Sequence, residues 1–84
     1  MKSVRMYTTG SCPFCIMAKR LLSQKGVTVE EVRVDSDAEQ REQMMRSTGR
    51  RTVPQIFVGE THVGGFDDLS AMERAGKLDP LLKD

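Results

Sequence analysis

Residues 4–34 contain two strand-like segments on either side of one helix-like segment. In residues 4–8, apolar side chains occupy every second position, which is the period of a β-strand. Residues 13–25 repeat apolar side chains at helical spacing and end at Gly26, the residue type that most often follows a helix. With residues 27–34 as a second strand, this order predicts two parallel strands joined by a right-handed crossover.

The second strand carries an irregularity in its pattern. Val29 and Val32 do not fall on the same side of a simple alternation, and an extra residue inserted into a strand has this effect. We therefore expect a bulge or an irregular edge between these two valines.

A second helix is marked by the residues at its start. Ser36 stands three residues before Glu39, the spacing of a capping box, in which each side chain accepts a hydrogen bond from the other residue's amide. We expect Ser36 to cap a helix that runs to about Thr48 and ends at Gly49.

The second half of the chain predicts a hairpin. Residues 55–58 form a short apolar run, residues 59–61 have the composition of a turn, and residues 62–64 return as a strand. The complete order is then β-α-β-α-β-β-α. It predicts an α/β fold with a mixed four-stranded sheet flanked by helices.

Helical segments close the chain. Asp67 or Asp68 is expected to begin a third helix that Gly76 stops. Asp79 and Pro80 have the order of an N-cap followed by a proline in the first helical position. We expect them to open a short last helical turn.

Length and charge limit what such a chain does. Its 84 residues predict a single domain, 1–84, and the net charge of +1 provides no large field to attract nucleic acid or anionic lipid. Arg46, Arg50 and Arg51 cluster locally, either as a solvated helix end or as an anion site. The longest apolar runs are three residues, and the N-terminus lacks a secretory pattern. A cytoplasmic protein is expected.

Cys12 and Cys15 are the only two cysteines. A disulfide between them closes a very small loop, so it constrains the unfolded chain little. Chemistry is therefore a better reason for the pair than stability. Residues three apart at a helix start lie close enough for a disulfide to form after a modest adjustment.

Pro13, at the start of the predicted helix, determines the position of Cys12. Pro13 is the favoured first residue of a helix, which places Cys12 at the N-cap. There a sulfur faces the free amides of Phe14 and Cys15 and the positive end of the helix dipole. Both effects favour thiolate over thiol. Cys12 is the predicted nucleophile, and Cys15 the thiol that resolves its mixed disulfide.

The cysteine pair has two other interpretations, a metal site and inert burial. A structural zinc ion needs four nitrogen or sulfur ligands, and beyond the cysteines the chain has one histidine, His62, on the predicted hairpin. A solvated strand residue is the expectation for His62, and no metal is expected. Inert burial of both cysteines is the other interpretation.

Three motifs together resemble a known family. They are Cys12–Cys15 after a strand, Thr52–Pro54, and Gly64–Asp68. In this order and spacing the chain resembles the dithiol glutaredoxins of the thioredoxin-like fold over nearly its whole length. The resemblance implies a cis-proline at Pro54 that faces the cysteines, and a Val53 backbone that pairs with glutathione like an added strand.

The resemblance also implies which residues contact glutathione. The helix start at Asp67 and Asp68 is expected to hold the γ-glutamyl end, while Arg50 or Arg51 pairs with the glycyl carboxylate at the opposite end. The full set of expected contacts is Phe14, Arg50, Arg51, Thr52, Val53, Pro54, Gly65, Phe66, Asp67 and Asp68.

Three positions depart from the common family pattern. Phe14 stands where tyrosine is usual, Thr9 where many members have lysine, and Phe66 where a small or thiol residue is frequent. The change at Thr9 leaves more of the thiolate stabilisation to the helix terminus. Phe66 is expected to narrow the γ-glutamyl pocket or to give it an apolar wall.

The resemblance implies a glutathione-dependent thiol–disulfide oxidoreductase. It would reduce protein disulfides with Cys12 and Cys15, and glutathione mixed disulfides with Cys12 alone. Expected partners are glutathione as co-substrate and disulfide-containing or glutathionylated proteins, with no nucleic acid, no membrane and a monomeric state. Two alternatives stay open: reduction by thioredoxin reductase, and a dimer that holds a 2Fe–2S cluster through Cys12 of each chain.

Overall fold

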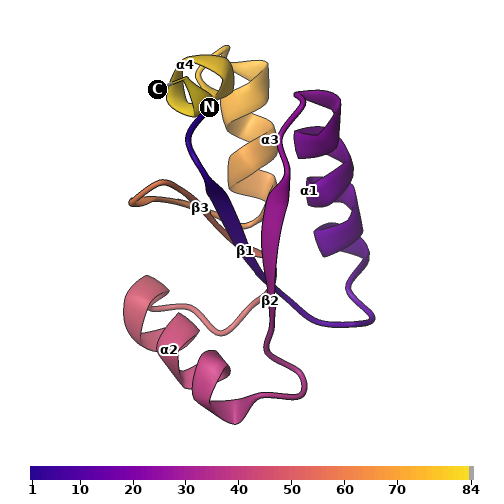
Figure 1. Cartoon of the computed structure of the whole chain (residues 1–84), viewed down its shortest axis with the longest axis vertical. Coiled ribbons are helices and arrows are strands. Elements are labelled where there is room, and N and C mark those ends of the chain that lie inside the picture. The colour runs from indigo at the N-terminus through magenta and orange to yellow at the C-terminus, as the bar shows by residue number, and fades with distance from the viewer. Residues whose placement is uncertain (84) are drawn as a thin grey trace.

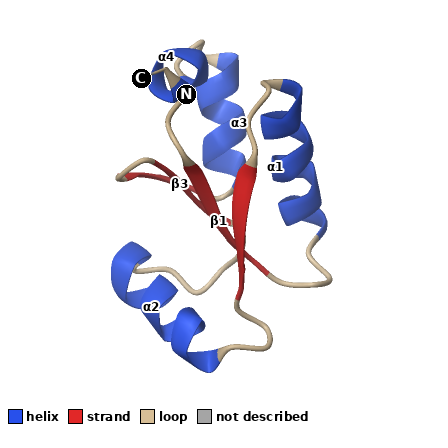
Figure 2. Cartoon of the chain, in the orientation of Figure 1, coloured by secondary structure: helices blue, strands red, loops and turns tan. Residues whose placement is uncertain are grey.

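The computed structural model describes residues 1–83 of the chain. In this part of the chain, strands and helices follow the predicted order, and the expected short last helix closes it (Figure 2). Their bounds are β1 (Val4–Thr8), α1 (Pro13–Gln24), β2 (Val29–Arg33), α2 (Ala38–Thr48), β3 (Gln55–Val58), β4 (Thr61–Gly64), α3 (Phe66–Arg74) and α4 (Leu78–Leu82).

The strands form one mixed sheet in the order β2-β1-β3-β4. β1 pairs with β2 in parallel and with β3 antiparallel, and β3 pairs with β4 antiparallel. Val4 lies opposite Val29 on one side and Val58 on the other. The predicted fold class is confirmed, and β1 lies in the interior of the sheet, directly before the cysteine motif.

Helices cover both faces of this sheet. One buried cluster joins Met6 of β1 to Ala18 and Leu22 of α1 and to residues of α3 and α4. The second cluster joins Tyr7 of β1 to Met44 of α2. In Figure 1, α1 and α3 run beside each other, while α2 stands apart from them. Because successive strand residues point to opposite faces, β1 supplies both cores.

The predicted bulge in the second strand is wrong. β2 pairs with β1 without interruption from Val29 to Arg33. Val29 packs against the cluster that contains α1, and Val32 against the cluster that contains α2. The two valines therefore point to opposite faces of a sheet that is covered on both sides. The irregularity in the sheet lies instead between Ile56 and Phe57, where β3 meets β4.

The expected cap of the second helix is also wrong by one residue. Asp37, not Ser36, is the N-cap of α2, and its Oδ1 accepts a hydrogen bond from the Gln40 amide at 3.2 Å. Aspartate and serine are equally good N-caps, so the pattern alone does not separate them. The helix ends as predicted at Gly49, whose φ of 72° is left-handed.

The last two helices begin earlier than predicted. Gly65 is the N-cap of α3, which starts at Phe66. Lys77 is the N-cap of α4, so Asp79 and Pro80 lie within its first turn. Proline is tolerated there because the first amides of a helix have no intrahelical partner.

Asp79 has a partner in another helix. Lys25 Nζ lies 3.0 Å from Asp79 Oδ1 and 2.7 Å from Glu73 Oε2. This ion-pair cluster ties the end of α1 to α3 and α4. No helix between residues 1 and 83 is long and apolar enough to cross a membrane.

The cap of α2 can be tested with a matched pair of variants. Asp37→Ala should lower the free energy of unfolding by about 1 kcal/mol, because it leaves the Gln40 amide without its partner. Ser36→Ala should change it by less than ~0.5 kcal/mol. Urea denaturation of both variants measures the difference, and a larger loss for Ser36→Ala would contradict the observed cap.

Candidate active site

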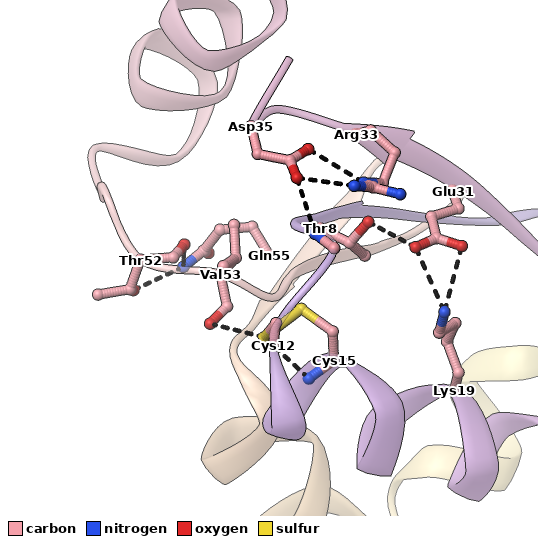
Figure 3. The surroundings of a disulfide bond; sticks show 11 residues. Thr8, Cys12, Cys15, Lys19, Glu31, Arg33, Asp35, Thr52, Val53 and Gln55 are labelled. Carbon is pink, nitrogen blue, oxygen red and sulfur yellow. Dashed lines mark hydrogen bonds and ion pairs between the residues drawn. A yellow bond between two sulfur atoms is a disulfide. The ribbon is translucent and has the colours of Figure 1, made fainter. Parts of the chain in front are cut away.

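Cys12 lies at the junction between β1 and α1. It is the N-cap of α1, in extended conformation, and Pro13 follows it in the first helical turn. Its Sγ accepts a hydrogen bond from the Cys15 amide at 3.1 Å (Figure 3). The predicted place of the sulfur at the positive end of a helix is confirmed. Such a position stabilises negative charge on the sulfur.

The two cysteines form a disulfide. Their Cα atoms are 5.2 Å apart, within the usual range for such a bond. The predicted pairing is therefore present. Cys12 retains 8% of its surface exposed and Cys15 only 1%. A thiol that approaches from solvent therefore meets Cys12 first.

The segment before β3 lies against the disulfide. The Val53–Pro54 peptide bond is cis, as the family resemblance implied, and Pro54 is buried. The Val53 carbonyl oxygen lies 3.8 Å from Cys12 Sγ (Figure 3). The Val53 amide has no hydrogen-bond partner among residues 1–83. The Val53 N–H beside the sulfur is thus available to a bound molecule.

A buried polar pair supports this segment. Gln55, which is fully buried, donates from Nε2 to the Thr52 carbonyl at 3.0 Å and to Thr52 Oγ1 at 3.2 Å. Its Oε1 therefore accepts from His62 Nε2 at 2.8 Å. Burial, and then the charge of Arg50, lower the pKa of His62. His62 is a half-buried, neutral donor, and the expectation of a solvated residue is wrong.

A groove opens beside Cys12 and Val53. Its volume is about 280 Å³, and every residue predicted to contact glutathione lines it except Arg51. The groove is thus built from the start of α1, the segment before β3 and the start of α3. Arg51 is exposed and lies outside the lining.

Arg50 and Asp68 meet within this groove. Arg50 Nη1 lies 2.9 Å from Asp68 Oδ2, and the same oxygen accepts the Gly65 amide at 2.9 Å. Arg50, and then that amide, hold the pKa of Asp68 below its usual range. The expectation that the arginines and the aspartates lie at opposite ends is therefore wrong for Arg50.

Two phenylalanines form one wall of the groove. The rings of Phe14 and Phe66 stack with their centroids 6.2 Å apart and their planes inclined by 26°. More than half of the Phe14 side chain, 54%, is exposed. Phe66, one of the positions that depart from the family pattern, supplies the apolar wall that the sequence suggested.

The turn before Cys12 is held from the opposite side by an ion pair that the sequence did not predict. The Gly10 amide donates to Asp35 Oδ2 at 2.9 Å, and Arg33 pairs with both oxygens of Asp35 (Figure 3). Arg33, and then Gly10, hold the pKa of Asp35 well below its usual range. A Cβ at Gly10 would crowd the Arg33 guanidinium, which is the end of a flexible and exposed side chain. The sequence has no local signal for this contact, because the pairing of β1 with β2 brings residues 10 and 35 together.

A second polar contact lies nearby on β2. Thr8, fully buried at the end of β1, donates to Glu31 Oε2 at 2.6 Å, and Lys19 of α1 pairs with the same carboxylate at 3.2 Å. The hydroxyl, and then Lys19, lower the pKa of Glu31. These bonds connect α1 to the sheet one turn beyond Cys15.

The chemical capacity of the site follows from this geometry. The accessible sulfur of Cys12 lies at a helix N-terminus and is bonded to the buried sulfur of Cys15. An open groove lies beside this disulfide. These are the features of a centre that exchanges disulfides. Within residues 1–83, no group of three or more histidine, cysteine, aspartate or glutamate side chains is arranged to hold a metal ion.

Comparison with known proteins gives a consistent result. The sequence pattern of the glutaredoxin family matches residues 4–63. A glutaredoxin from Pseudomonas aeruginosa is 57% identical over 82 residues, which are 98% of this chain and 98% of that protein. Glutaredoxin 3 from Escherichia coli K12 is 52% identical over 83 residues, 99% of this chain and 100% of that protein.

Solved structures agree with the fold. The glutaredoxin from Brucella melitensis has a TM-score of 0.87 at 49% identity and covers 99% of this chain and 90% of its own. A complex of buckwheat glutaredoxin with glutathione has a TM-score of 0.87 at 30% identity and covers 96% and 76%. The chain therefore belongs to the glutaredoxin family and is a glutathione-dependent thiol–disulfide oxidoreductase with a Cys12–Cys15 redox centre.

Proposed function

We propose that Cys12 is the nucleophile of this oxidoreductase and that Cys15 resolves the intermediate. The observation that carries the proposal is the bond from the Cys15 amide to Cys12 Sγ at 3.1 Å. In the reduced protein the same amide faces the Cys12 thiolate, and a hydrogen bond to a charged acceptor is stronger than one to a neutral acceptor. The greater exposure of Cys12 gives it access to the substrate.

Reduction of a protein disulfide then takes two exchanges. The Cys12 thiolate attacks one client sulfur, so that a new bond joins Cys12 to the client while the client's other sulfur leaves as a thiolate and takes up a proton. Cys15, as a thiolate, attacks Cys12 and releases the first client sulfur. The client gains two electrons and two protons, and the chain is left with the Cys12–Cys15 disulfide.

Glutathione restores the dithiol. One glutathione thiolate attacks Cys12 and frees Cys15, and a second attacks the glutathione sulfur bonded to Cys12. Two glutathione thiols are thereby oxidised to one glutathione disulfide, which an NADPH-dependent reductase recycles. A glutathionylated substrate enters at the intermediate stage, because Cys12 attacks its glutathione sulfur directly. That reaction requires Cys12 alone.

The groove is the proposed binding site for glutathione. Val53 borders it with an unpaired amide, and an extended peptide could pair there as an added strand. α3 has no side-chain cap at its start, so its first amides are available to a carboxylate. Exposed Asp67, which also lines the groove, is suited to the ammonium group of the γ-glutamyl end. The buckwheat relative was solved as a glutathione complex.

Arg50 is the proposed partner of a glutathione carboxylate. It lines the groove, and one of its nitrogens bonds Asp68, while guanidinium has further N–H groups to donate. Arg51 lies outside the lining. Thr52, Pro54, Phe14 and Phe66 complete the proposed contact surface.

The proposed cellular compartment is inferred from the related proteins. We place the chain in the bacterial cytoplasm, because its curated relatives include bacterial glutaredoxins and a dithiol centre that must be re-reduced by glutathione suits a reducing compartment. We propose that residues 1–84 act as one domain and as a monomer, with disulfide-bonded and glutathionylated proteins as clients and no resident metal.

The two cysteines should respond differently to substitution. Cys12→Ser should abolish turnover of every disulfide substrate. Cys15→Ser should retain reduction of a glutathione mixed disulfide and lose reduction of an intramolecular protein disulfide. An NADPH assay coupled to glutathione reductase measures both reactions, and the same assay with thioredoxin reductase tests the other electron donor. Turnover by Cys12→Ser would contradict the assigned nucleophile.

Ionisation of Cys12 can be followed by alkylation. In the reduced Cys15→Ser variant, iodoacetamide should modify Cys12 at about pH 6 at a large fraction of its rate at alkaline pH, because the α1 N-terminus favours the thiolate. Rates measured from about pH 4 to pH 10 give the titration. A curve like that of an ordinary cysteine, centred near 8.5, would remove the physical basis of the mechanism.

The adjacent arginines form a matched pair for the glutathione site. Arg50→Gln should raise KM for glutathione roughly fivefold, the size expected for one exposed charge-assisted contact. Arg51→Gln should leave KM within about twofold. Steady-state kinetics with varied glutathione measures both, and thermal unfolding shows whether loss of the Arg50–Asp68 pair has disturbed the fold. Equal effects of the two variants would refute the assignment of Arg50.

A further inference from the structure

A second groove lies between α1 and α3. Its volume is about 250 Å³, and its lining includes Met17, Arg20 and Leu21 from α1 and Phe66 and Arg74 from α3. We call it the α1–α3 groove. The two helices that form it run side by side on one face of the sheet (Figure 1).

This groove borders the active site at Phe66. Phe66 lines both the α1–α3 groove and the groove beside Cys12, and its ring stacks on Phe14. A polypeptide whose cysteine lies at the redox centre, either bonded to Cys12 or leaving from the glutathione that Cys12 attacks, can therefore cross the two aromatic rings and continue between the helices.

The surface beside the groove has the composition of an interaction surface. Met17, which lines the groove, is 45% exposed, and Ile16, the preceding residue of α1, lies outside the lining and is 51% exposed. Methionine, arginine and aromatic residues are enriched in protein–protein interfaces, and exposed apolar side chains that adjoin one another mark contact sites more often than isolated ones do.

The uncompensated charge of the groove is positive. The Arg20 guanidinium makes no hydrogen bond or ion pair with any residue from 1 to 83, and Arg74 donates only to the Ser70 hydroxyl, at 3.2 Å. Glu73, the acidic residue of the lining, is paired with Lys25 at 2.7 Å. A partner that fits this surface brings apolar and acidic side chains.

We propose that the α1–α3 groove is a docking subsite for the client polypeptide. It takes an apolar side chain beside Met17 and Leu21 and a carboxylate at Arg20 and Arg74. Arg20 lies about 12 Å along the helix from Cys12, at ~1.5 Å per residue, and an extended chain spans ~3.3 Å per residue. The preferred client therefore carries its acidic residue about three to five positions from the reacting cysteine.

The inference rests on the proposed reduction of protein substrates, and the experiment separates the two. The probes are synthetic peptides with one glutathionylated cysteine and two glutamates three to five positions before or after it, and the same peptides with lysines instead. A mixed disulfide of glutathione and free cysteine has no chain to reach the groove. Failure of the wild type to reduce this small substrate would overturn the proposed function itself.

The wild type should show a kcat/KM at least about fivefold higher for one of the glutamate peptides than for its lysine counterpart at low salt, and the preference should shrink as added salt screens the charges. Arg20→Glu should remove the preference and leave kcat/KM for the small mixed disulfide unchanged. The matched control is Arg41→Glu, an exposed arginine of α2 on the other face of the sheet, which should keep the preference. Met17→Ser should lower kcat/KM for both peptide types without affecting the small substrate.

Three outcomes would overturn the proposal. In the first, the wild type does not distinguish the peptides. In the second, Arg20→Glu slows the peptide and the small disulfide equally, which places the effect at the redox centre. In the third, sedimentation equilibrium shows a dimer that Met17→Ser dissociates, while the peptides are not distinguished. The groove would then be the interface with a second copy of this chain.

Discussion

The hydrogen bond from the Cys15 amide to Cys12 Sγ is the contact on which the function of this chain depends. It exists because Cys12 is the N-cap of α1, and α1 is fixed by Ala18 and Leu22, which are buried against the sheet. The hydrophobic core thus sets the direction in which the first amides of the helix point. The packing of side chains about two and three helical turns away therefore produces a reactive sulfur.

Three separate parts of the chain surround this sulfur, and polar contacts hold each of them. Asp35 bonds the turn before Cys12, Gln55 and His62 support the segment with Val53, and Asp68 joins the start of α3 to Arg50. Loop backbones gain little from apolar burial, so specific hydrogen bonds must position them. The site is built by these contacts as much as by the cysteines.

The features that the sequence predicted correctly are local. The bounds of β1 and the position of Cys12 before Pro13 depend on residues close together in the chain, and each has a recognisable pattern. The groove lining was anticipated through family resemblance, because its residues stand in short motifs.

The features that escaped prediction join residues that are distant in the sequence. The pair of Gly10 with Asp35 depends on the strand register, which a single sequence does not supply. The irregular pattern of Val29 and Val32 had two explanations, and only the packing of both sheet faces distinguishes them. The cap of α2 was misplaced because its two candidates are adjacent and of equal quality.

The capped sulfur also bears on the direction in which electrons flow. A thiolate accepts the Cys15 amide more strongly than a neutral disulfide sulfur does, so the helix start binds the reduced centre more tightly than the oxidised one. By thermodynamic linkage, an interaction that stabilises the reduced state favours reduction of the Cys12–Cys15 disulfide. A tripeptide thiol, present in excess, is then a sufficient electron source for a centre of this kind.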